Sequence, residues 1–141
     1  MAIAFIVVDN NIEFDPRLVK IVNYSFDETY ECSAELLDEF DDLTAVFCSE
    51  DLMAAAFINA AKDKGLKIPH DISVVGFDDL LPDNIIVHDM PLITTVRQAR
   101  QNMATQAVYA LINQIHGREE PYNLTFNLDL IIRNSTAPRR R

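Results

Sequence analysis

The stretch TAVFCSEDLMAAAFINAAKDKGLKIPHDISVVGFDDL, residues 44–80, decides the fold of this chain. It opens with an apolar run at residues 44–48 and closes with a second at residues 72–75, and both runs predict strands. Between them, Leu52 to Lys64 predicts a helix, because acidic residues precede it and a lysine followed by a glycine ends it. Two near-continuous apolar strands joined by a helix predict a parallel β-α-β unit.

The segments on either side extend this pattern. Residues 2–8 and 18–22 are apolar runs that predict two further strands. Ser25, with Glu28 three residues later, forms a capping box that predicts the start of a helix. Residues 97–116 predict a long helix with an apolar stripe at Met103, Ala107, Leu111 and Ile115. Short extended pieces are expected at residues 85–87, 92–96 and 124–132. The fold class is therefore α/β, a parallel sheet flanked by helices on both faces.

Size, charge and cysteine content restrict the class of protein. A chain of 141 residues suffices for one domain with its own core. The net charge of −10 disfavours binding to a phosphate backbone, which requires clustered lysine and arginine. The N-terminal apolar run has no basic residues before it, and no run reaches membrane-spanning length, so we expect neither a secretion signal nor a membrane partner. Two cysteines favour a reducing, cytoplasmic compartment.

The sequence offers little support for enzyme chemistry. His70, His88 and His116 lie far apart, and none has a metal-ligand spacing to a cysteine or another histidine. Three glycines in the whole chain build no phosphate-binding loop, and there is no GxSxG turn. Asp78 and Asp79 could hold a divalent cation, although adjacent aspartates are also frequent turn residues. We expect no enzyme activity, no cofactor and no metal.

Polar side chains directly follow the predicted strands. Such positions are held by Tyr24, by Ser49-Glu50-Asp51 and by the pair Asp78-Asp79. The carboxyl ends of parallel strands meet at one edge of a sheet, which is where α/β folds bind ligands. The sequence therefore predicts a binding site at this edge.

The chain resembles the effector-binding core of the lactose-repressor/galactose-repressor (LacI/GalR) family. The resemblance rests on TAVFCSEDLMA, IPHDISVVGFDDL, LITTVRQ and RNSTAP at their spacings, and it covers about residues 12–138. It implies the C-terminal lobe of a periplasmic-binding-protein-like fold, with residues 1–141 as a single effector-binding lobe of a transcriptional regulator. The implied partners are a sugar or nucleoside effector, a second copy in a homodimer, and DNA through a helix-turn-helix head that is not in this chain.

The resemblance also implies roles for four residues at the predicted edge. Asp78 would accept hydrogen bonds from ligand hydroxyls, and Tyr24 would stack on the ligand. Glu50 takes the place of an asparagine common in the family, and Arg97 would approach the ligand from the hinge between the lobes. Each has a structural alternative: Asp78 caps a turn, Tyr24 is half-buried, Glu50 complements a helix N-terminus, and Arg97 is a solvated surface residue.

The helix predicted from Leu52 is apolar almost all round, whereas a surface helix shows a polar face. Either it is wholly buried, or its second face meets another subunit. By the family resemblance we expect a homodimer through Leu52, Met53, Ala56, Phe57, Ala60 and Ile86.

Two other functions remain open from the sequence. The start AFIVVDNN and the acids at strand ends are compatible with a receiver-like signalling module that binds Mg²⁺ and accepts a phosphoryl group. A solute-binding protein shares the same fold logic, but the chain shows no signal peptide.

Overall fold

The computed structural model describes residues 14–80, 90–118 and 123–138. In chain order the elements are the 3₁₀ helix η1 (Pro16–Leu18), α2 (Phe26–Glu39), β1 (Ala45–Phe47), α3 (Asp51–Asp63), β2 (Ser73–Asp78), β3 (Thr94–Arg97), α4 (Arg100–Ile115) and β4 (Asp129–Ile131). The strands expected at residues 2–8 and 85–87 lie outside the described residues.

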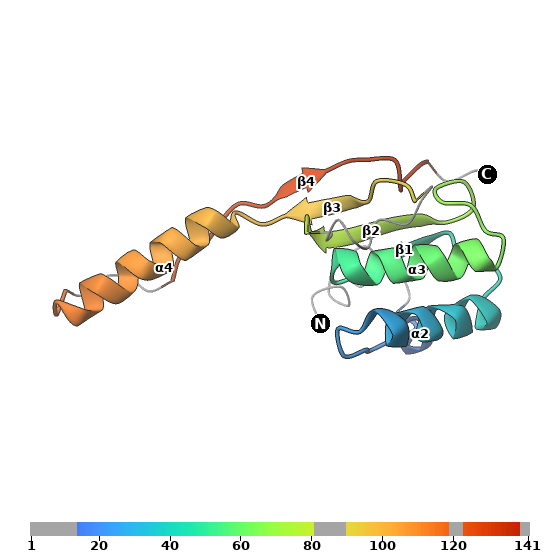
Figure 1. Ribbon diagram of the computed structural model, residues 1–141, viewed down its shortest axis with the longest axis horizontal. Coiled ribbons are helices and arrows are strands. Elements are labelled where there is room, and N and C mark those ends of the chain that lie inside the picture. Colours follow the sequence, from blue (N-terminus) through green and yellow to red (C-terminus); the bar gives the residue numbers. More distant parts are fainter. Residues whose placement is uncertain (1–13, 81–89, 119–122, 139–141) are drawn as a thin grey trace.

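The four strands form one sheet in the order β1-β2-β3-β4. The first three are parallel, as predicted, with Val46 opposite Val74 and Phe77 opposite Val96. β4 runs antiparallel to β3, so the sheet is mixed, with an antiparallel strand added to the predicted parallel part. The chain reaches β4 from the far end of α4, which lets it enter from the direction opposite to the other strands (Figure 1).

The core lies between β2 and α3 and between α3 and α2 (Figure 1). Val74 and Ile72 from the β2 side, Phe57 and Ile58 from α3, and Leu37 from α2 are all buried there. The run of alanines in α3 lets the helix approach both neighbours closely, because alanine adds almost no bulk. Of the two explanations for an all-round apolar helix, burial within the chain is therefore the correct one.

That burial corrects the predicted dimer surface. Met53, Ala56, Phe57 and Ala60 face the interior of their own chain, so they are not available to a second subunit. Leu52, at the start of α3, is only partly buried. Ile86, the remaining predicted contact, lies outside the described residues.

One of the two hydrogen bonds of the predicted capping box is present. The Ser25 hydroxyl accepts a hydrogen bond from the Glu28 backbone N–H at 3.3 Å, and α2 begins at the next residue, Phe26. The Glu28 carboxylate turns instead to Asn23, whose backbone N–H it accepts at 3.1 Å.

The strand expected at residues 18–22 does not form. Pro16 starts the 3₁₀ helix η1, and the Asp15 carboxylate caps it by accepting the Arg17 N–H at 2.9 Å. This 3₁₀ turn occupies the start of the apolar run, so the run does not extend as a strand. Further along it, Ile21 is 91% exposed.

In the described parts of the chain, the helices that pack on the sheet lie on one of its faces, whereas the sequence predicted helices on both. α3 packs on the sheet and α2 packs on α3, so the two form successive layers on one side (Figure 1). On β1, the side chain of Phe47 is 46% exposed. α4 projects away from the body, and none of its residues is buried (Figure 1).

Candidate functional site at the carboxyl edge of the sheet

The carboxyl ends of β2 and β3 meet at the edge where α2 and α3 begin and from which α4 departs (Figure 1). Asp78 and Arg97 are register partners at the ends of their strands. Glu50 precedes α3, and Tyr24 lies just before α2. The structure therefore places all four predicted ligand residues at this end of the molecule.

Asp51 is buried behind this edge, with 3% of its surface exposed. Its carboxylate accepts the Thr95 hydroxyl at 2.6 Å and the Leu80 backbone N–H at 2.7 Å. It thereby joins the start of α3 to β3 and to the loop after β2. The negative charge is also favourable at the N-terminus of a helix. The sequence placed Asp51 at this edge and before the helix, but it did not identify Thr95 and Leu80 as its partners.

Gly76 makes room for this arrangement. A Cβ atom at Gly76 would overlap Asp51 Oδ1 and lie 3.1 Å from Ile93 Cγ2. A glycine inside a strand often marks a close approach of another segment, so Gly76 was the feature of the sequence that could have predicted this contact.

Asp79, just after β2, forms ion pairs with two arginines at the same edge. One carboxylate oxygen lies 2.6 Å from Nη2 of Arg97, and the other lies 2.6 Å from Nη2 of Arg133. Arg133 also donates to the Ile93 carbonyl at 2.8 Å. Burial raises the pKa of the Asp79 carboxyl, but the hydrogen bonds and charges of Arg133 and Arg97 outweigh it, and the pKa lies below its ordinary value.

Arg133 is a residue of this edge that sequence reasoning missed. It stands in the RNSTAP segment, far along the chain from Asp79. The motif was recognised as a family feature, but nothing in its local pattern identifies a partner more than fifty residues away.

Asp78 and Asp79 form a turn in an unusual backbone conformation. Their φ angles are +99° and +54°, in the left-handed region that costs a non-glycine residue about 1–2 kcal/mol. The ion pairs of Asp79 and the bond from its N–H to Thr95 Oγ1, at 3.3 Å, hold this turn in place. Such strain is typical of functional sites.

The Asp78 carboxylate is partly available to a ligand. Gln98 Nε2 donates to Asp78 Oδ1. Within the described part of the chain, Asp78 Oδ2 accepts no hydrogen bond. The alternative reading of Asp78 as a turn cap is not what the geometry shows, because its side chain bonds to Gln98 and not to the backbone of its own turn.

The other predicted residues differ in their surroundings. Glu50 is the N-cap of α3, but its side chain makes no capping hydrogen bond. Tyr24 is 69% exposed, so its half-buried alternative was wrong. The Arg97 guanidinium is engaged by Asp79, which leaves it less available to a ligand than the sequence suggested.

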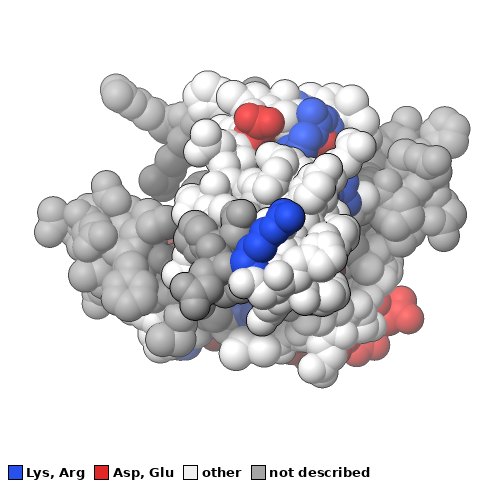
Figure 2. All heavy atoms as spheres, turned by 90° about the vertical axis from the view of Figure 1, so that its left-hand side faces the viewer, with Lys and Arg blue, Asp and Glu red and all other residues white. Residues whose placement is uncertain are grey.

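An open recess of about 810 Å³ lies where α4 leaves the edge, lined by Arg97, Gln98, Ala99, Arg100, Gln101, Asn102 and Thr105. Figure 2 looks at this end of the molecule, and most of the described surface in view carries no charge.

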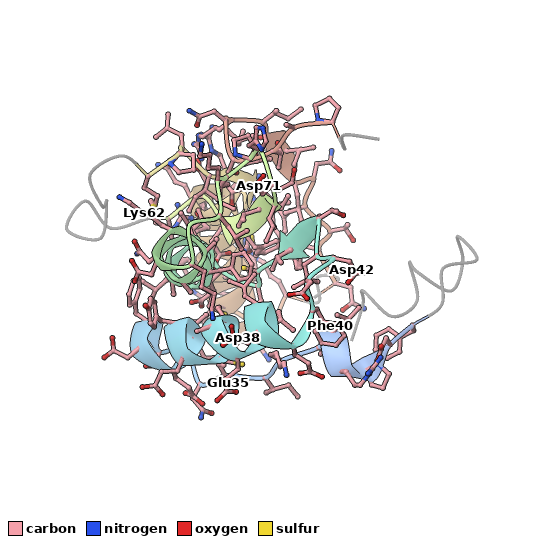
Figure 3. All side chains as sticks on the ribbon, turned by 90° about the vertical axis from the view of Figure 1, so that its right-hand side faces the viewer. Glu35, Asp38, Phe40, Asp42, Lys62 and Asp71 are labelled. Carbon is pink, nitrogen blue, oxygen red and sulfur yellow. The ribbon has the colours of Figure 1, made fainter. Side chains whose placement is uncertain are left out.

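A second hollow, of about 690 Å³, lies at the opposite end of α2, where Asp38, Phe40, Asp42 and Asp71 gather (Figure 3). There the Asp71 carboxylate bonds to His70 Nδ1 at 2.6 Å and accepts the Lys67 backbone N–H at 2.8 Å, and both contacts lower its pKa. The acidic side chains of this end are surface-exposed and in part paired with lysine.

Neither a metal centre nor a membrane span is found in the described ranges. No group of three or more His, Cys, Asp or Glu residues in residues 14–80, 90–118 and 123–138 is arranged to hold a metal ion. Within the same ranges, no helix has both the length and the apolar character needed to cross a bilayer.

The profile of the family described as "Periplasmic binding protein-like domain" matches residues 6–136. The transcriptional regulator MalR of Clostridium butyricum is 37% identical over 127 residues, which are 90% of this chain and 37% of MalR. The repressor CytR of Escherichia coli K12 is 35% identical over 126 residues, 89% of this chain and 36% of CytR. The chain therefore spans little more than a third of the length of these relatives.

Solved structures of regulators have the same fold. The CelR–cellobiose complex superposes with a TM-score of 0.81 at 31% identity, covering 92% of this chain and 39% of CelR. A LacI-family regulator from Enterococcus faecium with bound ribose gives a TM-score of 0.80 at 25% identity, covering 97% of this chain and 50% of the other.

Proposed function

Because this chain belongs to the periplasmic binding protein-like domain family, we propose that it is the effector-binding portion of a LacI-family transcriptional regulator whose effector is a sugar. The observation that carries the proposal is the Asp78 carboxylate, which stands at the carboxyl edge of the sheet with one oxygen free of protein hydrogen bonds in the described structure. Relatives of the same fold are complexes with cellobiose and with ribose.

The geometry of the edge suits a polyol. An ionised carboxylate only accepts hydrogen bonds, and its lone pairs can satisfy two neighbouring hydroxyl groups. Glu50, whose side chain is not used as a helix cap, supplies a second acceptor at the same end of the molecule. The exposed ring of Tyr24 offers an apolar face for the C–H side of a sugar. Arg97 has a supporting role here, since it holds Asp79.

Isothermal titration of this chain with cellobiose, lactose and ribose tests the proposal. We expect one of the three to bind, and Asp78→Asn to weaken that binding roughly 10-fold or more, because hydrogen bonds to a charged group contribute about 1.5–3 kcal/mol. Asp129→Asn is the matched control, since Asp129 is an exposed aspartate opposite Arg97 on β4 and should leave affinity unchanged.

Two outcomes contradict the proposal. One is the absence of heat with all three sugars at millimolar concentration. The other is binding that Asp78→Asn leaves intact, which would move the site away from the β2 tip.

A receiver-like module finds less support in the geometry. Such a module would bind Mg²⁺ through acids at the strand ends, but the carboxylates of Asp51 and Asp79 are already engaged by Thr95, Leu80, Arg97 and Arg133. A thermal-shift response to Mg²⁺ with acetyl phosphate, and none to the sugars, would favour the module.

Assembly and DNA binding stay predictions. We infer a homodimer in the complete regulator, but its contacts must use surface other than the buried side chains of α3. DNA contact would belong to a head outside this sequence. Sedimentation equilibrium of this chain at micromolar concentration measures directly whether it forms a dimer.

A further inference from the structure

Thr95 places a hydroxyl group inside the sheet, where its side chain is completely buried. A buried hydroxyl is unfavourable unless its hydrogen bonds are satisfied. Thr95 Oγ1 donates to Asp51 Oδ1 at 2.6 Å and accepts the Asp79 backbone N–H at 3.3 Å. Both directions are fixed, because a carboxylate only accepts and an N–H only donates. Valine has nearly the same shape as threonine, but it could make neither bond.

The Asp51 carboxylate extends this connection to the next residue of the loop. Its second oxygen, Oδ2, accepts the Leu80 backbone N–H at 2.7 Å, and its side chain lies where Gly76 leaves space. Two consecutive N–H groups, those of Asp79 and Leu80, are thus bound to one buried carboxylate, the first through Thr95 and the second directly. Because most of α3 is buried, this carboxylate at the start of the helix is a fixed point.

The N–H groups that are held in this way follow Asp78 in its turn. Asp78 and Asp79 have φ angles of +99° and +54°, which non-glycine residues keep only where their surroundings impose them. The ion pairs of Asp79 hold its side chain, whereas the bonds to Thr95 and Asp51 hold the backbone itself. Without the backbone bonds the turn is free to relax toward negative φ, and the direction of the Asp78 carboxylate changes with it.

We propose that Thr95 is a positioning residue for the effector, because its hydroxyl keeps the Asp78–Asp79 turn in the conformation that presents the Asp78 carboxylate. This inference rests on the proposed function, since it takes Asp78 as the effector contact. Thr95 itself is fully buried and acts only through the turn. It raises the affinity by raising the fraction of molecules in which the turn is already formed, because the apparent affinity falls in proportion to that fraction.

Isothermal titration of three variants with cellobiose, lactose and ribose tests this role. Thr95→Val removes the hydroxyl at constant shape and should weaken binding of the responding sugar roughly 10-fold, as expected if the turn is formed in about a tenth of the molecules. Thr95→Ser keeps the hydroxyl and should stay within about 2-fold of the unsubstituted chain. Thr94→Val is the matched control and should leave the affinity unchanged. Thr94 is also buried on β3, but its hydroxyl bonds to the Arg133 backbone and to the Thr136 hydroxyl.

Amide hydrogen exchange, followed by NMR without ligand, measures the turn directly. In the unsubstituted chain, the Asp79 and Leu80 N–H groups should exchange at least about 100-fold more slowly than in a free peptide, because both are hydrogen-bonded. Thr95→Val should speed exchange at Asp79 roughly 10-fold, because its N–H loses its acceptor. Thr94→Val also loses a buried hydroxyl and the stability that goes with it, but it should leave exchange at Asp79 unchanged. The difference between the two variants therefore reports on the turn and not on overall stability.

Each outcome decides the inference. Sugar affinity that Thr95→Val leaves unchanged, while Asp78→Asn weakens it, overturns the positioning role and leaves the proposed function standing. An equal loss of affinity in Thr94→Val also overturns it, since the effect would then come from lowered stability. If no sugar binds the unsubstituted chain, the proposed function fails and the role of Thr95 fails with it. If Thr95→Val does not fold, the unsubstituted chain decides: slow exchange at Asp79 and Leu80 supports the inference, and exchange as fast as in a free peptide overturns it.

Discussion

Helices α3 and α4 carry similar apolar signals and have opposite surroundings. Nine of the 13 residues of α3 are buried, and the helix packs against both β2 and α2. α4 has 16 residues, with an apolar stripe that includes Leu111 and Ile115, and none of them is buried. An apolar face predicts that a helix is buried, but it does not predict which part of the molecule covers the helix.

The two helices also differ in how they are attached at the edge that carries the candidate site. α3 begins with the buried carboxylate of Asp51 and forms a fixed wall of the edge. α4 starts at the same edge, two residues after the end of β3, and none of its residues is buried.

A pair of isoleucines tests this contrast most strongly. Ile58 on α3 is 3% exposed and Ile115 on α4 is 72% exposed. Ile58→Ala should lower the free energy of unfolding by about 3 kcal/mol, because it leaves a cavity in the core. Ile115→Ala should change it by less than about 0.5 kcal/mol. Urea denaturation followed by circular dichroism measures both, and equal losses would show that α4 is covered in solution.

A pair of glycines sharpens the same contrast with a smaller effect. Gly76→Ala should cost about 2 kcal/mol, because the added methyl group meets Asp51 and Ile93 at the contact between β2 and α3. Gly117→Ala, just after α4, meets no atom within 4 Å and bears only the strain of its φ of +68°, about 1 kcal/mol. Thermal unfolding of the two variants side by side gives the comparison. A milder effect at Gly76 would mean that α3 can shift away from the sheet.

The ion pairs at the joint between the two regions should have the smallest effect, and one that depends on pH. The pKa of Asp79 lies below its ordinary value of 3.8 in the folded chain. Its stabilisation is therefore complete above that ordinary value and is lost as the pH falls through the lower folded pKa. Asp79→Asn should cost about 1 kcal/mol at pH 7, because both arginines are partly exposed.

Below the folded pKa of Asp79, the variant and the unsubstituted chain should converge in stability. Urea denaturation at pH 7 and at pH 3 follows this trend, and Arg17→Gln is a control for a surface pair remote from the joint. A gap between the two proteins that stays constant with pH would assign the loss to altered packing and not to charge.

Local chemistry explains which parts of the fold could be predicted. The β-α-β unit, the Ser25 cap and the start of α2 depend on neighbouring residues, and the structure confirms them. The run at residues 18–22 was misread because strand character was judged from apolarity, while Pro16 and Asp15 formed a local turn. The placement of Glu50 and Asp78 at one edge followed from the direction of parallel strands, whereas the strand predicted before Tyr24 does not form.

The sequence by itself determined the β-α-β unit, the long helix after β3, the family and the edge that carries the candidate site, because these depend on periodicity, turn residues and motif spacing. Only the tertiary structure decided that α3 is buried by its own chain, that β4 runs antiparallel, and that Asp79 is taken by Arg97 and Arg133. The same holds for the link between Gln98 and Asp78. These features depend on contacts between residues far apart in the chain, which no local pattern encodes.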